Sequence, residues 1–499
     1  MASATRNQLS CLWASAVDGT RSSHVAVSAR SARVTQTGRY LPINRILTNH
    51  VGDGGTPVQR QTRRDVLFAL SGTAVALSGC STDLSSGDTD ARAAPQETEP
   101  TPTEPAAVTE PTDDSRPAMF VHLDTLSAIQ SRVEDGDSPW TEAHEAFMED
   151  VREAMAAAPE SVTDNGDGHE FKTKGPEDPT ERKDYVAAIR TGDRIRDLGL
   201  AYQYTGADQY AEKAIELLDH WFLRSETYMA PVKTNGIEQF ITLPKMWWGA
   251  ELVRGHEAWN SDSVGTEADL RAWVRTFLDD VGHGIPTAMG QQNIFNWKEM
   301  THAAGSVYLR DWDRFRDAIQ RNREDGFRQL REDGLLENEI IRASSLAYSL
   351  YAAKALVTAA ELSRLYADRL DGPTLYEYQK FAGDRGAIER ILDAHAPYVA
   401  DPAAWEAMGE DDPDRFVNSD GFPARKQEAA SSLYEVAYSY YEKDTYLEAL
   451  KQSGQPVKNV PTYVSAQQAA IDNPDRPHRD ERILGWTTFT HGERFRLDL

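Results

Sequence analysis

Apolar residues recur at spacings of three and four through most of the chain beyond Met119, which is the pattern of amphipathic helices. Gly, Asp and Pro separate the periodic segments, and the alternation typical of strands is scarce. We therefore expect an all-α domain over residues 118–499. The clearest periodic segments are 185–204, 210–222 and 346–366.

The periodic segments come in pairs joined by short connections, and each pair predicts two antiparallel helices. Three such pairs are 184–204 with 207–222, 247–256 with 270–281, and 297–309 with 311–330. Successive pairs can stack into a curved array around a central cleft. Because 382 residues exceed the usual size of one compact core, we expect an α/α toroid, an incomplete ring of helical hairpins.

Residues 62–80 have the order of an exported lipoprotein signal. The Arg63-Arg64 pair precedes a twelve-residue apolar run, 66–77, and a box of small residues that ends at Cys80. Twelve residues are too few to span a bilayer, so the segment predicts a twin-arginine signal with lipidation at Cys80. The mature chain would then be exported and lipid-anchored at the outer face of the cell membrane.

The segments on either side of the signal are treated separately from the folded domain. Residues 1–61 are an unassigned extension, because a signal normally begins a few residues before its arginines, and a misplaced start codon would explain them. Residues 81–117 carry six prolines and nine acidic residues against two arginines, which predicts an acidic, extended tether. Cys11 is the other cysteine, so lipidation of Cys80 would leave the mature chain without a disulfide.

The folded domain is expected to be strongly acidic. The whole chain carries −26, of which residues 1–80 contribute +6 and residues 81–117 contribute −7, which leaves about −25 for residues 118–499. Nucleic acid is excluded as a partner, since binding phosphates requires Lys and Arg. High salt shortens the screening length to about 3 Å at 1 M and makes self-repulsion tolerable. Together with the signal, this composition is typical of exported haloarchaeal proteins.

Residues 339–349 place four polar side chains three positions apart, namely Glu339, Arg342, Ser345 and Tyr348. Steps of three keep side chains on one slowly drifting helical face, so we expect all four along one helix. An arginine and a tyrosine there meet two needs of uronate chemistry, which are neutralising a carboxylate and transferring a proton.

Two segments carry a resemblance to a known enzyme family. Residues 291–298 form an Asn-rich stretch that ends in Trp-Lys, and residues 333–339 form an Asp-Gly turn before the Glu-x-x-Arg-x-x-Ser-x-x-Tyr-Ser pattern. Their order resembles the alginate lyase family, and its oligoalginate-lyase branch in particular, over residues 119 to about 378. The resemblance implies an α/α toroid and a polysaccharide lyase that cleaves alginate or a related polyuronate by β-elimination, without a cofactor or metal.

The resemblance also implies roles for single residues. Asn293 would hydrogen-bond the uronate carboxylate, Arg342 would assist it, and Tyr348 would exchange protons with the substrate. Removing the C5 proton leaves a carbanion that is delocalised into the carboxylate, which requires donors around that group. The charge of Arg342 would favour a phenolate at Tyr348, and the phenol could then protonate the departing O4 oxygen. The candidate substrate-binding residues are Gln292, Trp297, Lys298, His302 and Glu339.

One position departs from the family pattern. Where the family commonly has a histidine directly after the asparagine, this chain has Ile294. Lys298 and His302, about one and two turns further along the same face, are candidates to compensate. If neither reaches the cleft, the enzyme would act through Tyr348 alone, prefer a different uronate epimer, or not be a lyase.

Each candidate has a structural interpretation as well. Tyr348 could be a core aromatic on a buried helix face, and Arg342 could simply pair with Glu339. Asn293 could be a helix N-cap. The alternatives for the other candidates are packing for Trp297, a structural histidine for His302 and a solvated side chain for Lys298.

Two functional alternatives stay open on sequence grounds. A glycoside hydrolase on the same ring would use paired carboxylates, among Asp333, Glu337 and Glu339. A glycan-binding lipoprotein would need no catalytic residues.

The histidines lack the spacing of metal ligands and no phosphate-binding loop occurs, so neither metal nor nucleotide is expected. For an anionic polysaccharide partner, local positive charge would come from Arg342, Lys298 and Lys233. The oligomeric state is left open.

Overall fold

The computed structural model describes residues 117–162, 183–232, 237–260, 265–283, 292–342, 345–412, 430–452 and 483–492. The expected extension, signal and tether through residue 116 lie outside these ranges, as does Lys233. Among the described residues, one short antiparallel hairpin pairs β1 (Pro117–Ala118) with β2 (Val121–His122). The α-helices are α1 (Leu123–Glu134), α2 (Trp140–Ala156), α3 (Lys183–Thr205), α4 (Asp208–Phe222), α5 (Leu243–Leu252), α6 (Glu267–His283), α7 (Asn293–Leu309), α8 (Trp312–Arg321), α9 (Glu337–Ile340), α10 (Ser345–Leu365), α11 (Ala387–Ala400), α12 (Pro402–Asp411), α13 (Ala430–Tyr441), α14 (Asp444–Gln452) and α16 (Thr487–His491).

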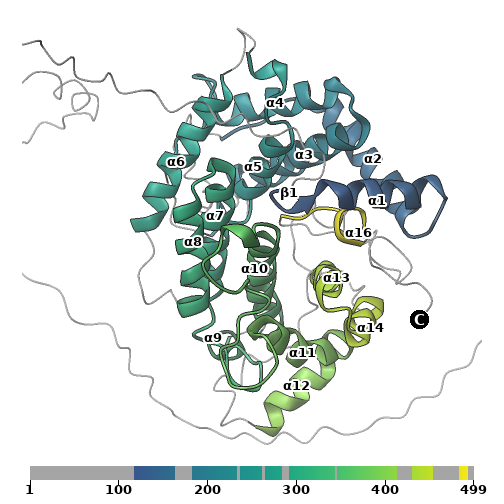
Figure 1. Ribbon diagram of the computed structural model, residues 1–499, viewed down its shortest axis with the longest axis vertical. Helices are drawn as coiled ribbons and strands as arrows, with labels where there is room; N and C mark the ends of the chain where they lie inside the picture. The colour runs from purple at the N-terminus through teal and green to yellow at the C-terminus, as the bar shows by residue number, and fades with distance from the viewer. Residues whose placement is uncertain are drawn as a thin grey trace, which may run out of the picture. The chain divides into compact units, whose positions relative to one another are not determined.

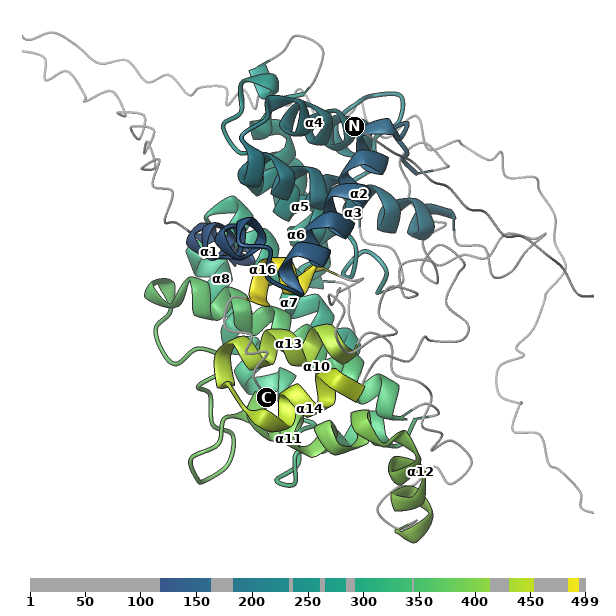
Figure 2. The ribbon, with the colours of Figure 1, turned by 90° about the vertical axis from the view of Figure 1, so that its right-hand side faces the viewer.

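The helices form two concentric series. In the first, α3, α5, α7, α10 and α13 each pack against the next, and the series bends round in Figure 1. The second series backs the first, with α4 on α3, α6 and α8 on α7, α11 on α10 and α14 on α13. The C-terminal helix α16 contacts α2 and α13, and it lies beside α1 in Figures 1 and 2. This arrangement confirms the α/α toroid that the paired periodic segments predicted.

Local sequence explains how one hairpin turns and how closely two helices approach. Between α3 and α4, Gly206 has a φ of 68° and its N–H donates to the carbonyl of Tyr202 at 2.8 Å. A residue without a Cβ adopts this left-handed conformation at little cost. Where α5 meets α3, a Cβ on Gly249 would lie 2.5 Å from the carbonyl oxygen of Ile195. Glycine at this position therefore allows the two backbones to approach.

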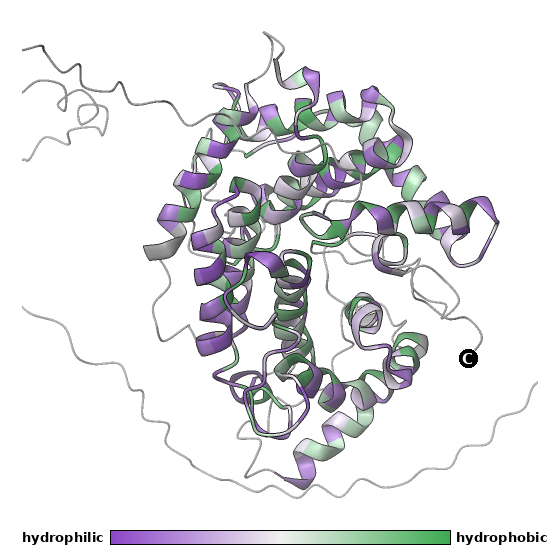
Figure 3. Cartoon of the chain, viewed as in Figure 1, coloured by the Kyte–Doolittle hydropathy of each residue, from purple (hydrophilic) through white to green (hydrophobic). Residues whose placement is uncertain are grey.

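The two series differ in how much of each helix is buried. On α7 and α10 buried residues occur all round the helix, whereas α8 buries one face through Phe315, Ala318 and Ile319. Figure 3 shows the same contrast, with α10 largely in hydrophobic colours and α8 largely in hydrophilic ones. Helices enclosed by neighbours are apolar on all sides, and outer helices keep one solvent-exposed face.

Within the described ranges, every helix is too short or too polar to span a bilayer.

The expectation of one continuous helix through residues 339–348 is wrong. Helix α9 has four residues, Glu337–Ile340, and α10 begins at Ser345, so Arg342 lies in the connection between them. The serine side chain competes for backbone hydrogen bonds and favours helix starts over helix interiors. The break places Glu339, Arg342 and Tyr348 on three separate pieces of backbone.

Candidate active site

The carboxylate of Glu339 joins the start of α7 to the connection before α10. Its Oε1 accepts the backbone N–H of Asn293 at 2.6 Å, and both of its oxygens lie 3.0 Å from Asn293 Nδ2. Arg342 Nη1 also donates to Oε2, at 3.1 Å. Glu339 is 0% exposed, so these donors satisfy a carboxylate that water does not reach. We call Glu339, Asn293 and Arg342 the carboxylate frame.

The protonation state of Glu339 depends on its burial and on the donors around it. Burial raises the pKa of Glu339, and the hydrogen bonds from Asn293 and the charge of Arg342 lower the pKa by a smaller amount. Glu339 therefore takes up a proton at milder acidity than an ordinary glutamate does. A neutral Glu339 would hold Arg342 less firmly, because a charge-assisted hydrogen bond would become an ordinary one.

Arg342 lies against the ring of Tyr348. The guanidinium carbon is 3.4 Å from the ring centroid, which is the stacked geometry of a cation–π contact. The Arg342 side chain is 29% exposed and Tyr348, on the first turn of α10, is half-buried. Tyr348 is therefore accessible to a ligand, unlike a core aromatic residue. Within the described residues Arg342 Nη2 makes no hydrogen bond, so it can reach a ligand that approaches the phenol.

Two of the candidate residues, Gln292 and Asn293, lie at the beginning of α7. Gln292 is the residue before the helix, with φ −124° and ψ 173°, and Asn293 is the first helical residue. The interpretation of Asn293 as an N-cap is therefore wrong, because its amide points across to Glu339 instead of back to its own helix. Gln292 and Ile294 are both half-buried at this helix end, so each keeps some access to solvent.

Trp297 lies in the interior between α7 and α10. Its side chain is 0% exposed, and its ring centroid is 5.0 Å from that of Tyr351, three residues beyond Tyr348. This contact holds the two inner helices together next to the carboxylate frame. The contacts of Trp297 are those of a packed core residue.

Lys298 and His302 gather round a second buried carboxylate, Glu299. Lys298 Nζ lies 2.9 Å from Oε1, His302 Nδ1 lies 3.3 Å from Oε2, and Arg321 of α8 donates to Oε2 at 2.8 Å. Burial raises the pKa of Glu299, but these neighbours outweigh it and bring the pKa to about 2. The polar contacts of Lys298 and His302 in the described ranges are with Glu299 and Arg321. The structure thus gives both compensating candidates a partner in this second cluster.

The carboxylates that a glycoside hydrolase would need are not arranged as a catalytic pair in this site. Asp333 and Glu337 are exposed, whereas Glu339 is enclosed and occupied by its donors. In the part of the chain that the structure describes, no cluster of three or more His, Cys, Asp or Glu side chains is placed to hold a metal ion. Tyr348 and Arg342, which are both partly exposed, remain candidates to act on a ligand.

A family model described as alginate lyase matches residues 85–405, which is well over half of the chain. The chain belongs to the alginate lyase family. Members of this family are polysaccharide lyases, which are carbon–oxygen lyases, so the hydrolase and the non-catalytic binder are set aside. A search of curated proteins found no significant match.

Solved alginate lyases share the fold of this family member. The enzyme from Bacteroides ovatus is 19% identical, with a TM-score of 0.52, and the match covers 69% of this chain and 96% of that one. Alginate lyase A1-III from Sphingomonas species A1 is 14% identical, with a TM-score of 0.52 and coverages of 75% and 95%. A tyrosine-to-phenylalanine variant of A1-III, complexed with a tetrasaccharide, is 14% identical, with a TM-score of 0.51 and coverages of 78% and 99%.

The sequence predicted the candidate residues of this site and anticipated one of their contacts, the pair between Arg342 and Glu339. It did not anticipate that Glu339 binds Asn293, because the two lie 46 positions apart and on different elements. It also overlooked Glu299, although an acid directly after Lys298 and three residues before His302 was a local indication that both side chains had a partner.

Proposed function

We propose that this alginate lyase family member cleaves alginate or a related polyuronate by β-elimination, with Tyr348 as the proton carrier and Arg342 as the partner of the uronate carboxylate. The observation that supports the proposal most directly is the stacking of the Arg342 guanidinium on the half-buried Tyr348 ring at 3.4 Å. A cation and a phenol side by side match the two demands of the reaction.

The reaction proceeds in three electronic steps at one uronate unit. Tyr348, as the phenolate, removes the C5 proton, and the electron pair is delocalised into the C6 carboxylate beside Arg342. The pair then forms the C4–C5 double bond as the C4–O4 bond breaks. The phenol returns its proton to O4, so the products are a chain with a new end and an unsaturated uronate, and no water is consumed.

Asn293 and Glu339 position the pair formed by Arg342 and Tyr348. Asn293 is expected from the family resemblance to bind the carboxylate, but its amide is held by Glu339 in this structure. We therefore assign Asn293 and Glu339 the task of fixing Arg342 in place. With Ile294 in the histidine position, one residue acts as both base and acid, which suits a uronate whose C5 hydrogen and O4 oxygen lie on the same face.

The decisive experiment follows the ultraviolet absorbance of the unsaturated product with a panel of polyuronates in high salt. We expect absorbance to rise without hydrolysis, and Tyr348→Phe to lower turnover by about 10²- to 10⁴-fold with an unchanged melting temperature. The ring stays in place in this variant, so a loss of activity reports the missing hydroxyl. Reducing ends without absorbance, or full activity in Tyr348→Phe, would contradict the proposal.

We also propose that the protein is an exported lipoprotein, anchored through Cys80 at the outer face of the membrane. The order of Arg63-Arg64, the apolar run and the cysteine box supports this. Changing Cys80→Ser should move the protein from the membrane to the soluble fraction. Replacing both arginines by lysine should prevent export, and normal secretion of that variant would argue against the twin-arginine route.

A further inference from the structure

A polar cavity lies at the end of α10 that is remote from Tyr348. It has a volume of about 70 Å³, and Arg364, on the last turn of α10, contributes to its lining. Arg364 lies sixteen positions after Tyr348, which corresponds to about 24 Å along a helix. We call it the Arg364 cavity, and it is separate from the carboxylate frame.

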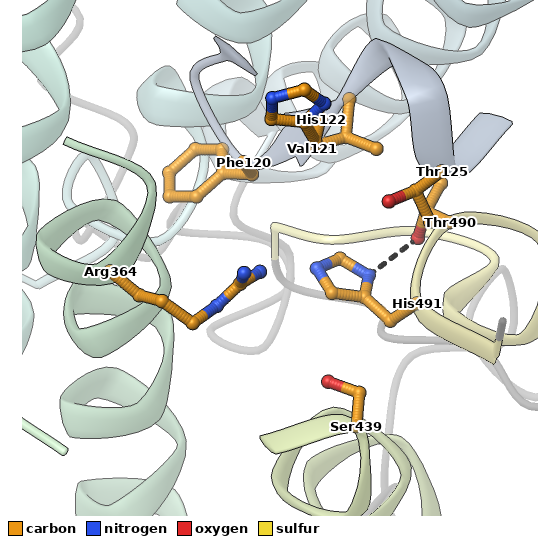
Figure 4. A pocket seen from close by; sticks show the side chains of 8 residues that line it. All are labelled: Phe120, Val121, His122, Thr125, Arg364, Ser439, Thr490 and His491. Carbon is orange, nitrogen blue, oxygen red and sulfur yellow. Dashed lines mark hydrogen bonds between the residues drawn. The ribbon is translucent and has the colours of Figure 1, made fainter. Parts of the chain in front are cut away.

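Several elements distant in sequence bring polar side chains to this cavity (Figure 4). The polar residues that line it are His122, Thr125, Arg364, Ser439, Thr490 and His491. They come from β2, α1, α10, α13 and α16, so the cavity exists only when both ends of the toroid have packed together. A cavity lined mainly by donors and acceptors is suited to a polar ligand.

The Arg364 guanidinium is held in place by a buried carboxylate behind it. Arg364 Nη2 and Nε lie 2.6 and 3.2 Å from Glu361 Oε2, and Tyr376 donates its hydroxyl to Glu361 Oε1 at 2.6 Å. Glu361 is 0% exposed, whereas the Arg364 side chain is 38% exposed. Within the described residues Nη1 makes no hydrogen bond, and Figure 4 shows the guanidinium directed into the cavity. A fixed guanidinium with free donors binds carboxylates with little loss of side-chain freedom.

The Ser439 hydroxyl is arranged as an acceptor toward the cavity. It donates its own proton to the carbonyl of Val436 at 2.7 Å, so its lone pairs can accept hydrogen bonds from a ligand. The hydroxyl of Thr490 is engaged within the protein, because Oγ1 lies 2.7 Å from His491 Nδ1 (Figure 4) and 3.2 Å from the carbonyl of Trp486. The site thus offers a cation for a carboxylate and an acceptor for a hydroxyl group, which are the two functional groups of a uronic acid.

We propose that the Arg364 cavity is a second binding site that takes the carboxylate of a uronic acid. Its volume of about 70 Å³ accommodates a carboxylate group. The ring would lie at the mouth, beside His122, whose side chain is 34% exposed. The choice of a uronate as the source of the carboxylate rests on the proposed function, whereas carboxylate binding rests on the cavity alone.

The test measures binding of mannuronate monomer to the folded chain by calorimetry and by the imidazole NMR signals of His122 and His491. We expect both signals to shift with mannuronate and with acetate, and not with mannose. Arg364→Gln should weaken mannuronate binding at this site at least tenfold, because it removes a charged donor. Ser439→Phe should block the cavity while leaving the pair between Arg364 and Glu361 intact, so it tests the site even if Arg364→Gln fails to fold.

Arg342→Gln, at the other end of α10, is the matched control. It should abolish lyase activity and leave the two histidine signals responsive to mannuronate. Ser439→Phe should retain lyase activity and abolish the response of the two histidine signals. An unchanged response in Ser439→Phe, no response to any carboxylate, or a response to sulfate alone would overturn the proposal. Because binding and absorbance are measured separately, failure of the second site is distinguishable from failure of the lyase assignment.

Discussion

Arg342 is hydrogen-bonded to the buried carboxylate of Glu339 at 3.1 Å while its guanidinium carbon lies 3.4 Å from the centre of the Tyr348 ring. The first contact fixes the position of the cation, and the second places the cation over the face of the phenol ring. The pair therefore depends on a carboxylate that is fully buried. This relationship leads to predictions that separate the geometry of the cation from its charge.

Arg342→Lys keeps the positive charge but removes the planar group that stacks on Tyr348. We expect turnover to fall about 10- to 100-fold, since a lysine cannot bond Glu339 and cover the ring at the same time. The melting temperature should change little because the side chain is partly exposed. Steady-state kinetics would measure the effect, with Arg328→Lys, which pairs with Asp325 in an i,i+3 surface contact, as the control.

Glu339→Gln tests the acidic limb of the pH profile. Burial raises the pKa of Glu339, so the wild-type enzyme should lose activity on acidification above the ordinary pKa of 4.5. The variant should have a lower maximum rate and lack this limb. The stability of the fold should depend on pH in the opposite direction. Because the pKa of Glu339 is higher in the folded state than in the unfolded state, its contribution to stability is full below the unfolded-state pKa. That contribution is lost as the pH rises through the folded-state pKa. An identical acidic limb in both proteins would exclude Glu339 as its origin.

Ile294→His restores the side chain that the family commonly has beside the asparagine. Ile294 is half-buried at the start of α7, so a histidine there has room to reach solvent and ligand. We expect turnover to rise about tenfold or more, with a new dependence on pH near 6.5. Ile294→Asn is the control for polarity alone. Equal rates in all three proteins would show that this position does not face the reacting uronate.

His302→Ala tests whether the missing histidine has been relocated. His302 contacts Glu299 and Arg321, so we expect a lower melting temperature but a turnover within a few-fold of wild type. Thermal melts and kinetics on the same sample would distinguish the two effects. A loss of turnover as large as that of Tyr348→Phe would mean that His302 does reach the substrate.

Glu435→Gln tests a buried carboxyl group on α13 that accepts a hydrogen bond from Thr488 at 2.8 Å. Burial raises the pKa of Glu435 to about 8, against the effect of its threonine donors. Its stabilising contribution is present below the unfolded pKa of 4.5 and is lost as pH rises to about 8. The variant should therefore melt higher than wild type at alkaline pH, and the gap should close in acid. A gap independent of pH would contradict this assignment.

The sequence by itself determined the local structure and the chemical inventory of this protein. Apolar spacing located the hairpin of α3 and α4, and Gly206 fixed its turn because one residue's φ decides it. The motif around Asn293 and the pattern ending at Tyr348 predicted the side chains of the candidate site. These features depend on neighbours within a few positions, so a linear pattern can specify them.

Tertiary structure alone decided which side chains meet across distant parts of the chain. Asn293 and Glu339 bond across 46 positions, and α10 begins after Arg342 instead of running through it. His302 shares a helix with Asn293 but packs toward Arg321 on α8. Periodicity defines the faces of a helix, but not which neighbour each face meets, because that follows from how all the helices pack together.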